Sequence, residues 1–531
     1  MDSAIARIDA RELHARLMGE TEIALLDVRE EGVFGASHIL CASNVPTSCF
    51  ERLVAALVPR RATPVILCDD DETLSERAAV LLAAHGYSSV AILRGGIAAW
   101  KSAGLEIFSG VYVPSKAFGE FVEAHYHTPH IDGPDLKRRI EARENIVLLD
   151  SRPFDEYHWI SIPGAIDCPG GELVLRGREA VPSPDTLVVV NCGGRTRSII
   201  GAQILIDAGL PNKILSLKDG TQGWHLAGMK IARGQDKVAS LPGERAAAWA
   251  REAAQRLAAR FGINVIDGAT LDCFERETDA RTLYRFDVRD PGEYRAGHRK
   301  GFLSAPGGQL VQATDTFIAV RQARIVLADS DGVRARTTAS WLVRMGFAHV
   351  YVLDEAAPIV DVEYGDAPEH VLGLDRVAVD PIGVDELAKH LGCDAALVVD
   401  VGTSRHYRAG HIPGAWFAIR GRFAQDSKRL PSSPLYVLTS PDGVTARLAA
   451  AELAEVTGAP VRVLPGGTDA WRAAGHRLET DQERLASRAD DVLLKAFERT
   501  DDPEAAMREY LQWEVGLVEQ VRRDGTVRFR L

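Results

Sequence analysis

One thiol of this chain lies where a loop could make it reactive. Cys192 ends the apolar run DTLVVVNC and begins CGGRTRS, which leads into an amphipathic helix. In a glycine-rich loop before a helix, successive backbone N–H groups can point inward and hold negative charge. Such a loop lowers the pKa of a thiol, and Arg195 and Arg197 would lower it further. We therefore expect Cys192 to be a nucleophilic thiolate. The remaining loop residues are Gly193, Gly194, Thr196 and Ser198.

The elements around this loop recur along the chain. Four segments open with a short apolar run that ends in aspartate, and each is followed by a second apolar run, a loop and an amphipathic helix. The opening aspartates are Asp27, Asp150, Asp287 and Asp400. The loop begins 42 residues after the aspartate in three segments and 40 residues after it in the fourth. This regular spacing predicts a tandem repeat of four units.

Strands that alternate with helices at this spacing predict an α/β fold, in which each unit is a mostly parallel sheet flanked by helices. The expected boundaries are 1–110 for unit 1, 111–235 for unit 2, 236–370 for a linker helix and unit 3, 371–480 for unit 4, and 481–531 for a helical tail. The linker helix and the tail should pack across unit boundaries. The last residues, TVRFRL, are expected to form a short strand.

Three units have lost the thiol. Asp69, Asp329 and Ser440 stand at the loop position of units 1, 3 and 4. An aspartate there can accept the hydrogen bonds of the loop N–H groups and so act as an internal anion. We therefore expect one active unit, while the other three cover it, shape access to it or dock an acceptor protein.

Composition excludes several classes of protein. The chain has 531 residues, with 62 Lys and Arg against 74 Asp and Glu and a net charge of −12, which disfavours nucleic acid or an anionic membrane as a partner. A charged first segment without a long apolar run favours the cytoplasm. The seven cysteines are widely spaced without a CxxC pair, so the sequence predicts no disulfide framework, no metal site and no cofactor.

The repeated motifs resemble the rhodanese-type sulfurtransferases. They are the opening Asp-x-Arg, the segment RAGHIPGAW, the loop after the central strand, and a glycine pair that precedes a tryptophan in three units. The resemblance implies that Cys192 takes the outer sulfur of a donor such as thiosulfate, holds it as a persulfide and passes it to cyanide or a thiol. It also implies that the N–H groups of residues 193–198 stabilise the persulfide and that Arg195 and Arg197 bind an anionic donor. Asp150 and Arg152 would brace the loop.

Further residues and activities remain open from the sequence. Unit 2 has Ile160 and Ser161 where unit 4 has Gly-His, so His158 is a candidate substrate contact, although a packing role is favoured. Cys168 is a candidate second thiol, and it and Cys68 are expected in the core. A tyrosine-phosphatase loop needs one residue more than the four that separate Cys192 from Arg197. In place of a thiosulfate sulfurtransferase, the sequence also allows a non-catalytic scaffold or sensor, a mercaptopyruvate or persulfide donor, and a redox or arsenate reductase.

Overall fold

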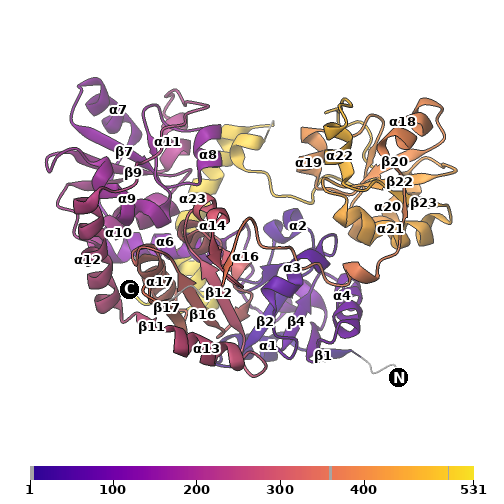
Figure 1. Ribbon diagram of the computed structural model, residues 1–531, viewed down its shortest axis with the longest axis horizontal. Coiled ribbons are helices and arrows are strands. Elements are labelled where there is room, and N and C mark those ends of the chain that lie inside the picture. Colours follow the sequence, from indigo (N-terminus) through magenta and orange to yellow (C-terminus); the bar gives the residue numbers. More distant parts are fainter. Residues whose placement is uncertain (1–4, 358–360, 500) are drawn as a thin grey trace.

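The structure is a computed structural model that describes residues 5–357, 361–499 and 501–531. Four parallel sheets follow one another along the chain, as the repeat predicted (Figure 1). Each places the strand that ends in the opening aspartate beside the strand that leads into the loop. Within the described residues, none of the helices combines the length and the apolar composition needed to cross a membrane.

Unit 2 shows how the common sheet is built. Its strands are arranged in the order β6-β10-β9-β7-β8, and all of its strand pairs are parallel. The central strand β9 is rich in valine and buried along its whole length, as expected for a strand covered on both faces. The strands are β6 (His130–Ile131), β7 (Ile146–Asp150), β8 (Ile166–Asp167), β9 (Leu187–Asn191) and β10 (Ile214–Leu217). The helices are α7 (Gly133–Glu141), α8 (Phe154–Trp159), α9 (Leu173–Ala180), α10 (Thr196–Asp207) and α11 (Gly220–Leu226).

Unit 1 repeats this order and gains an extra strand from unit 3. Its strands are β1 (Ala6–Ile8), β2 (Ile23–Asp27), β3 (Ser43–Asn44), β4 (Val65–Cys68) and β5 (Val90–Leu93). Its helices are α1 (Ala10–Leu17), α2 (Glu31–Ala36), α3 (Phe50–Leu57), α4 (Thr73–Ala84) and α5 (Gly96–Ser102). The short strand β15 (Val320–Arg321) of unit 3 pairs antiparallel with β2, so the two units share a sheet edge.

Unit 3 has the same five-stranded parallel sheet. Its strands are β11 (Asn264–Ile266), β12 (Leu283–Asp287), β14 (Leu303–Ser304), β16 (Arg324–Ala328) and β17 (Val350–Leu353), and β13 (His298–Arg299) pairs antiparallel with β18 (Val362–Glu363). Its helices are α13 (Gly268–Arg276), α14 (Pro291–Ala296), α15 (Gly307–Gln312), α16 (Thr314–Phe317) and α17 (Arg334–Arg344). Among the described residues, no helix follows β17 where α5 and α11 stand in units 1 and 2, in agreement with the lost glycine-tryptophan ending.

Unit 4 lies at one end of the molecule (Figure 1). Its strands are β19 (Asp380–Pro381), β20 (Leu397–Asp400), β21 (Trp416–Phe417), β22 (Tyr436–Thr439) and β23 (Val461–Val463). Its helices are α18 (Val384–Gly392), α19 (Ser404–Ala409), α20 (Phe423–Asp426), α21 (Val444–Thr457) and α22 (Gly467–Ala473). One continuous core joins units 1, 2 and 3, whereas the core clusters of unit 4 contain only its own residues and those that follow it.

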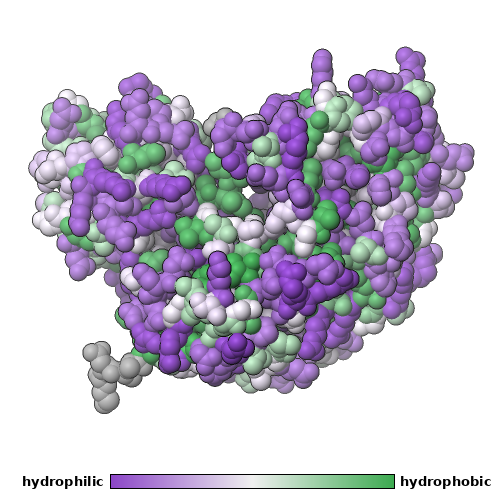
Figure 2. Space-filling model, turned by 180° about the vertical axis from the view of Figure 1, so that it is seen from behind, coloured by the Kyte–Doolittle hydropathy of each residue, from purple (hydrophilic) through white to green (hydrophobic). Residues whose placement is uncertain are grey.

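Three further helices connect the units. They are α6 (Val113–Tyr126), α12 (Glu244–Phe261) and α23 (Pro503–Asp524). The alanines of α12 are buried against α9 and α17, and α23 packs along α6, so both predicted helices cross unit boundaries as expected. On the face seen in Figure 2, hydrophilic residues cover most of the outer lobes and hydrophobic residues gather around the hollow between them.

The prediction of a short strand at the end of the chain is wrong. The described residues after α23 form no strand, although Phe529 packs against Phe118 and Phe121 with ring centroids 5.1 and 5.0 Å apart. A backbone hydrogen bond from Arg530 N to Arg344 O, at 2.7 Å, joins this segment to the end of α17. The apolar side chains of this segment therefore contribute packing and not strand pairing.

Candidate active site

Cys192 lies at the carboxyl end of β9, in the loop that leads into α10. Its carbonyl accepts a hydrogen bond from Thr221 N at 2.8 Å, which ties the loop to the start of α11. Gly220 allows this approach, because it has a φ of +54° and a Cβ there would lie 2.4 Å from the Cys192 carbonyl oxygen. The Cys192 residue is 2% exposed. The loop therefore holds the thiol inside the protein, between the starts of α10 and α11.

The electrostatic environment of Cys192 differs from the expectation. Burial raises the pKa of the thiol, while the Arg197 charge, the Ser198 hydroxyl and the backbone N–H groups of Ser198 and Gly194 act to lower it. The thiol also donates a hydrogen bond to Ser198 Oγ at 3.6 Å. The predicted stabilising contacts are present, but desolvation outweighs them. The prediction of a lowered pKa is therefore wrong for the resting protein.

The two loop arginines have different partners. The Arg195 guanidinium donates to both oxygens of Glu120 at 2.7 and 2.8 Å, to Asp219 at 3.2 Å and to Glu123. Three carboxylates therefore surround the Arg195 guanidinium and neutralise its charge. Glu120 and Glu123 belong to α6, which approaches the start of α10 closely. Gly119 allows this approach, since a Cβ there would lie 3.0 Å from Thr196 Cα.

Arg197 has one acidic partner. Its Nη2 donates to Glu156 Oε2 at 2.8 Å, and Lys495 Nζ lies 3.2 Å from the other oxygen of Glu156. Burial acts to raise the pKa of Glu156, but the charges of Arg197 and Lys495 lower it to about 2. The charge of Arg197 also acts directly on Cys192. Arg197 is therefore the guanidinium that this geometry places in the electrostatic field of the thiol.

Asp150 and Arg152 form a buried pair beside the loop. Arg152 donates from Nε and Nη2 to the two oxygens of Asp150 at 2.8 and 2.7 Å, and from Nη2 to Ile160 O at 2.6 Å. Asn191, which directly precedes Cys192, donates from Nδ2 to Asp150 Oδ2 at 3.0 Å. The pair therefore contacts the end of β9, which is the geometry of the expected brace.

Sequence reasoning missed a cluster that covers the loop. Tyr510 and Glu514 on α23 lie against the thiol-bearing loop, and Lys116 on α6 lies over the Tyr510 ring (Figure 1 shows the two helices). The nearest atoms to a Cβ at Gly194 would be Tyr510 Cε1 at 3.0 Å and Glu514 Oε2 at 3.3 Å. A sequence signal exists, since Glu514 interrupts the buried face of α23 formed by Met507, Leu517 and Val521.

This cluster contains charges that are buried together. Lys116 Nζ lies 4.9 Å from the ring centroids of both Tyr510 and Trp513, as in a cation–π contact. Burial lowers the pKa of Lys116 to about 8, although the Glu514 carboxyl acts in the opposite direction. Glu514 is 0% exposed, and its burial raises its pKa. The site therefore contains a lysine and a carboxyl whose pKa values are both displaced toward neutrality.

The other thiols do not occupy the first position of a repeat loop. Cys68 and Cys168 are fully buried in hydrophobic core clusters, as expected. Cys41 lies 3.1 Å from Arg321 Nη1, but its burial raises its pKa. His158 is exposed, stacks on Phe154 and contacts Gln235 O at 3.0 Å through Nδ1, a packing position in line with the favoured expectation.

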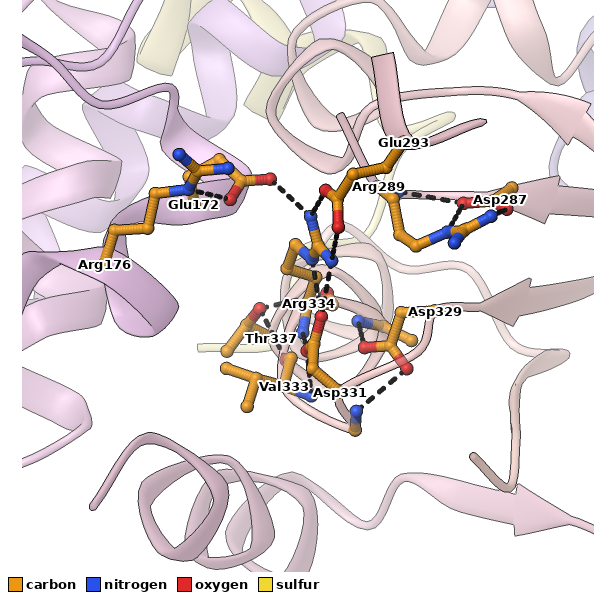
Figure 3. Close-up of polar contacts among 12 residues, drawn as sticks. Glu172, Arg176, Asp287, Arg289, Glu293, Asp329, Asp331, Val333, Arg334 and Thr337 are labelled. Atoms are coloured by element: carbon orange, nitrogen blue, oxygen red, sulfur yellow. Dashed lines mark hydrogen bonds and ion pairs between the residues drawn. The ribbon is translucent and has the colours of Figure 1, made fainter. Parts of the chain in front are cut away.

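The side-chain carboxyls of Asp69 and Asp329 fill the loops of units 1 and 3, which is the geometry that the hypothesis predicted. Asp69 accepts hydrogen bonds from Glu72 N at 3.0 Å and Leu74 N at 2.8 Å. Asp329 accepts from Gly332 N at 3.0 Å and Ala335 N at 2.9 Å, which Figure 3 shows. In unit 4 the shorter Ser440 side chain accepts one such bond, from Ala446 N at 3.3 Å.

The loop of unit 3 also binds unit 2. Arg334 stands five residues after Asp329, as Arg197 does after Cys192. It pairs with Glu293 and with Asp331, and it reaches Glu172 of unit 2 at 3.0 Å (Figure 3). Arg334 is 2% exposed. The arginine position of the repeat therefore serves here as a contact between units.

Comparisons with known proteins agree with this architecture. A thiosulfate sulfurtransferase from Pseudomonas aeruginosa has a crystal structure that is 45% identical, covers 99% of this chain and 100% of its own, and superposes with a TM-score of 0.95. Two curated relatives match one segment each. An HTH-type transcriptional regulator of Mycobacterium tuberculosis is 35% identical over 100 residues, and a putative sulfur carrier protein of Bacillus subtilis is 26% identical over 96 residues.

The two curated matches are partial, since they cover 19% and 18% of this chain and 43% and 50% of the relatives. The family model of the Rhodanese-like domain, in contrast, matches four segments that together make up most of the chain, at residues 9–103, 133–227, 271–357 and 383–474. Each matched segment begins just after the first strand of a unit and contains the other four strands of its sheet. The chain belongs to the rhodanese-like family, with four such domains in tandem and a sulfurtransferase fold.

Proposed function

We propose that this protein is a thiosulfate sulfurtransferase with a single active site at Cys192. The observation that carries the proposal is the contrast among the four loops. The backbone N–H groups of Gly194 and Ser198 act to lower the pKa of the Cys192 thiol, whereas Asp69 and Asp329 fill the same loop position with their own carboxyls. The similarity over the whole length to a thiosulfate sulfurtransferase supports the choice of donor.

In the proposed reaction, the Cys192 thiolate attacks the outer sulfur of thiosulfate. A new S–S bond forms to Cys192 Sγ, the S–S bond of thiosulfate breaks, and sulfite leaves with the electron pair. The N–H groups of Gly194 and Ser198 stabilise the thiolate and the persulfide, because they are fixed before the reaction and need not reorient. A thiol or cyanide then takes the outer sulfur and regenerates Cys192.

Donor recognition is assigned mainly to Arg197. Arg195 belongs to the expected site, but its contacts with Glu120, Glu123 and Asp219 favour a role in holding α6 against the loop. Among the described residues, Arg197 forms an ion pair with Glu156 alone, and its side chain is 19% exposed. An arriving dianion can exchange contacts with Glu156 and gain the charge of Arg197. The thiol loop, residues 192–198, with Asp150 and Arg152 behind it, forms the proposed site.

The proposal is tested by supplying different donors to the purified protein. Thiosulfate should place one sulfur atom on Cys192, and peptide mass spectrometry should find the other six cysteines of the seven unmodified. Cys192→Ser should abolish transfer to cyanide or glutathione. If only mercaptopyruvate or glutathione persulfide loads Cys192, that compound and not thiosulfate is the donor. Absence of turnover with every donor would favour a role as a scaffold or sensor.

A further inference from the structure

A carboxyl from the end of the chain faces the thiol loop with one oxygen unused. Glu514 Oε1 accepts hydrogen bonds from the Tyr510 hydroxyl at 2.7 Å and from the Thr196 hydroxyl at 3.2 Å. Glu514 Oε2 is buried and has no hydrogen-bond partner among the described residues. Because an unpaired buried polar atom costs free energy, such an atom beside a reactive group calls for an explanation.

The position of Oε2 places it on the Gly194 side of the loop. It would lie 3.3 Å from a Cβ on Gly194, whose backbone N–H acts on the Cys192 sulfur. Since Oε1 already accepts two hydrogen bonds, a proton on this carboxyl belongs on Oε2. Burial raises the pKa of Glu514, which makes the carboxylate a stronger base. Lys116, from the facing helix α6, supplies the opposing charge.

We propose that Glu514 is a catalytic residue that accepts the proton of a thiol acceptor while the acceptor takes sulfur from the Cys192 persulfide. This inference rests on the proposed function and specifies the acceptor class as a thiol. A carboxylate beside the thiol loop has no use with an acceptor that carries no proton. It becomes useful when the nucleophile must lose one, and a positioned base of this kind commonly contributes roughly 10²–10⁴-fold to a rate.

The step balances without an oxidant or reductant from outside. The acceptor S–H gives its proton to Glu514 Oε2, and its sulfur forms a bond with the outer sulfur of the persulfide. The bond between that sulfur and Cys192 Sγ breaks, and its electron pair remains on Sγ as a thiolate held by the Gly194 and Ser198 N–H groups. The product is the persulfide of the acceptor. Glu514 then returns its proton to Cys192 or to water.

The test measures this half of the reaction alone. The protein is first loaded with sulfur from glutathione persulfide, and single-turnover transfer to glutathione is compared with transfer to sulfite at mildly alkaline pH, where sulfite is largely unprotonated. Glu514→Gln retains an Oε1 that accepts from Tyr510 and Thr196 but has no base. We expect transfer to glutathione to fall roughly a hundredfold or more and transfer to sulfite to stay unchanged. Glu509→Gln, an exposed site on the same helix, should change neither.

Two results would overturn the inference: an equal loss with both acceptors, or no loss with glutathione. If Glu514→Gln does not fold, the solvent deuterium isotope effect of the unmodified protein decides. An effect with glutathione and none with sulfite supports proton transfer, whereas equal effects contradict it. Failure of thiosulfate to load Cys192 would overturn the proposed donor and leave this result intact, because the loading here uses a persulfide.

Discussion

The two arginines of the Cys192 loop differ in what their charge contacts. Arg195 is 8% exposed and bound to three carboxylates, while Arg197 contacts one and acts on the thiol. Residue spacing alone made them equal candidates for donor binding. Their acidic partners distinguish the two arginines as donor-binding groups, because a guanidinium surrounded by fixed carboxylates attracts a dianion only weakly.

Arg197→Ala should therefore discriminate between donors. Loss of one charged contact costs about 1.5 to 3 kcal/mol, so kcat/KM for thiosulfate should fall roughly tenfold to a hundredfold or somewhat more. With the less highly charged donor group of glutathione persulfide the loss should be smaller. Initial rates of sulfur transfer with the two donors measure this difference.

Arg195→Ala is the variant to compare with Arg197→Ala. It leaves Glu120, which is 5% exposed, without its partner, and removal of one member of a buried ion pair costs about 3 to 5 kcal/mol. We expect a lower unfolding midpoint and similar losses with both donors. A selective loss of thiosulfate activity in Arg195→Ala, with Arg197→Ala active, would reverse the two assignments.

The raised pKa of the resting thiol also has a measurable consequence. Burial raises the pKa of Cys192, so the thiolate fraction at neutral pH is small and grows as the pH rises. Alkylation of Cys192 by iodoacetamide, followed by peptide mass spectrometry, should continue to accelerate above about pH 8.5, the ordinary pKa of a thiol. Arg197→Ala removes a charge that lowers this pKa, and its alkylation should be slower at any pH below the pKa. A rate that is constant from neutral pH upward would contradict the raised pKa.

Sequence reasoning identified residues whose contacts lie within one repeat. The thiol, the Asp150–Arg152 pair and the aspartate-filled loops follow from local patterns, because their partners lie at fixed positions in the same unit. It did not find partners from other segments. Arg195 and Glu120 are 75 residues apart, and Thr196 and Glu514 are 318 apart. No periodicity within one helix specifies which distant loop that helix will cover.

At the scale of elements, the loop before α17 shows how a unit without the loop thiol is closed. The Asp329 carboxyl takes the place of a bound anion, and burial raises its pKa to about 7. The neighbouring Asp331 acts in the same direction. The N–H groups that would stabilise a persulfide in unit 2 are therefore used here to hold the start of a helix.

Asp329→Ala should lower the free energy of unfolding by roughly 1 to 3 kcal/mol, because it leaves two backbone N–H groups without an acceptor. The loss should depend on pH. With a pKa of about 7 in the folded protein against 3.8 in the reference state, protonated Asp329 stabilises the fold at low pH, and this contribution is lost as the pH rises through about 7. Chemical unfolding of both proteins at several pH values measures the difference.

The sign of that dependence is the critical result. The stability difference between the parent and Asp329→Ala should be larger near pH 4 than near pH 8. A difference that grows with pH would mean that the carboxylate form is the stabilising one. Unchanged stability at all pH values would contradict the idea that the carboxyl fills the loop.

At the scale of the molecule, the tail links units that are distant in sequence. After unit 4 the chain passes unit 1, where Leu493 N donates to Glu31 at 2.9 Å. It then reaches unit 2, where Phe497 packs on Trp159 with ring centroids 6.4 Å apart, before α23 covers the thiol loop. The sequence predicted a helix there that crosses a boundary. Which boundary it crosses depends on the packing of units whose relative positions no local pattern encodes.

Ion pairs join unit 4 to unit 1, and this allows a prediction about cooperativity. Arg420 donates to both oxygens of Glu51 at 2.8 Å, and the two residues are 5% and 4% exposed. The adjacent Arg52 instead pairs with Glu369 and Asp442, which are more exposed. Since unit 4 has its own core, these contacts decide whether it unfolds with the rest.

Glu51→Ala should uncouple unit 4, because it leaves a buried guanidinium with only Glu452 as its acidic partner, at a cost of about 3 to 5 kcal/mol. Arg52→Ala, one residue away, should cost about 1 kcal/mol or less, as exposed pairs do. We expect hydrogen exchange in β20, β22 and β23 to accelerate in Glu51→Ala and to remain slow in Arg52→Ala. Sulfur loading of Cys192 should persist in both, since the thiol loop lies outside this contact. Equal exchange in the two variants would mean that apolar contacts and the tail, rather than the buried pair, hold unit 4 in place.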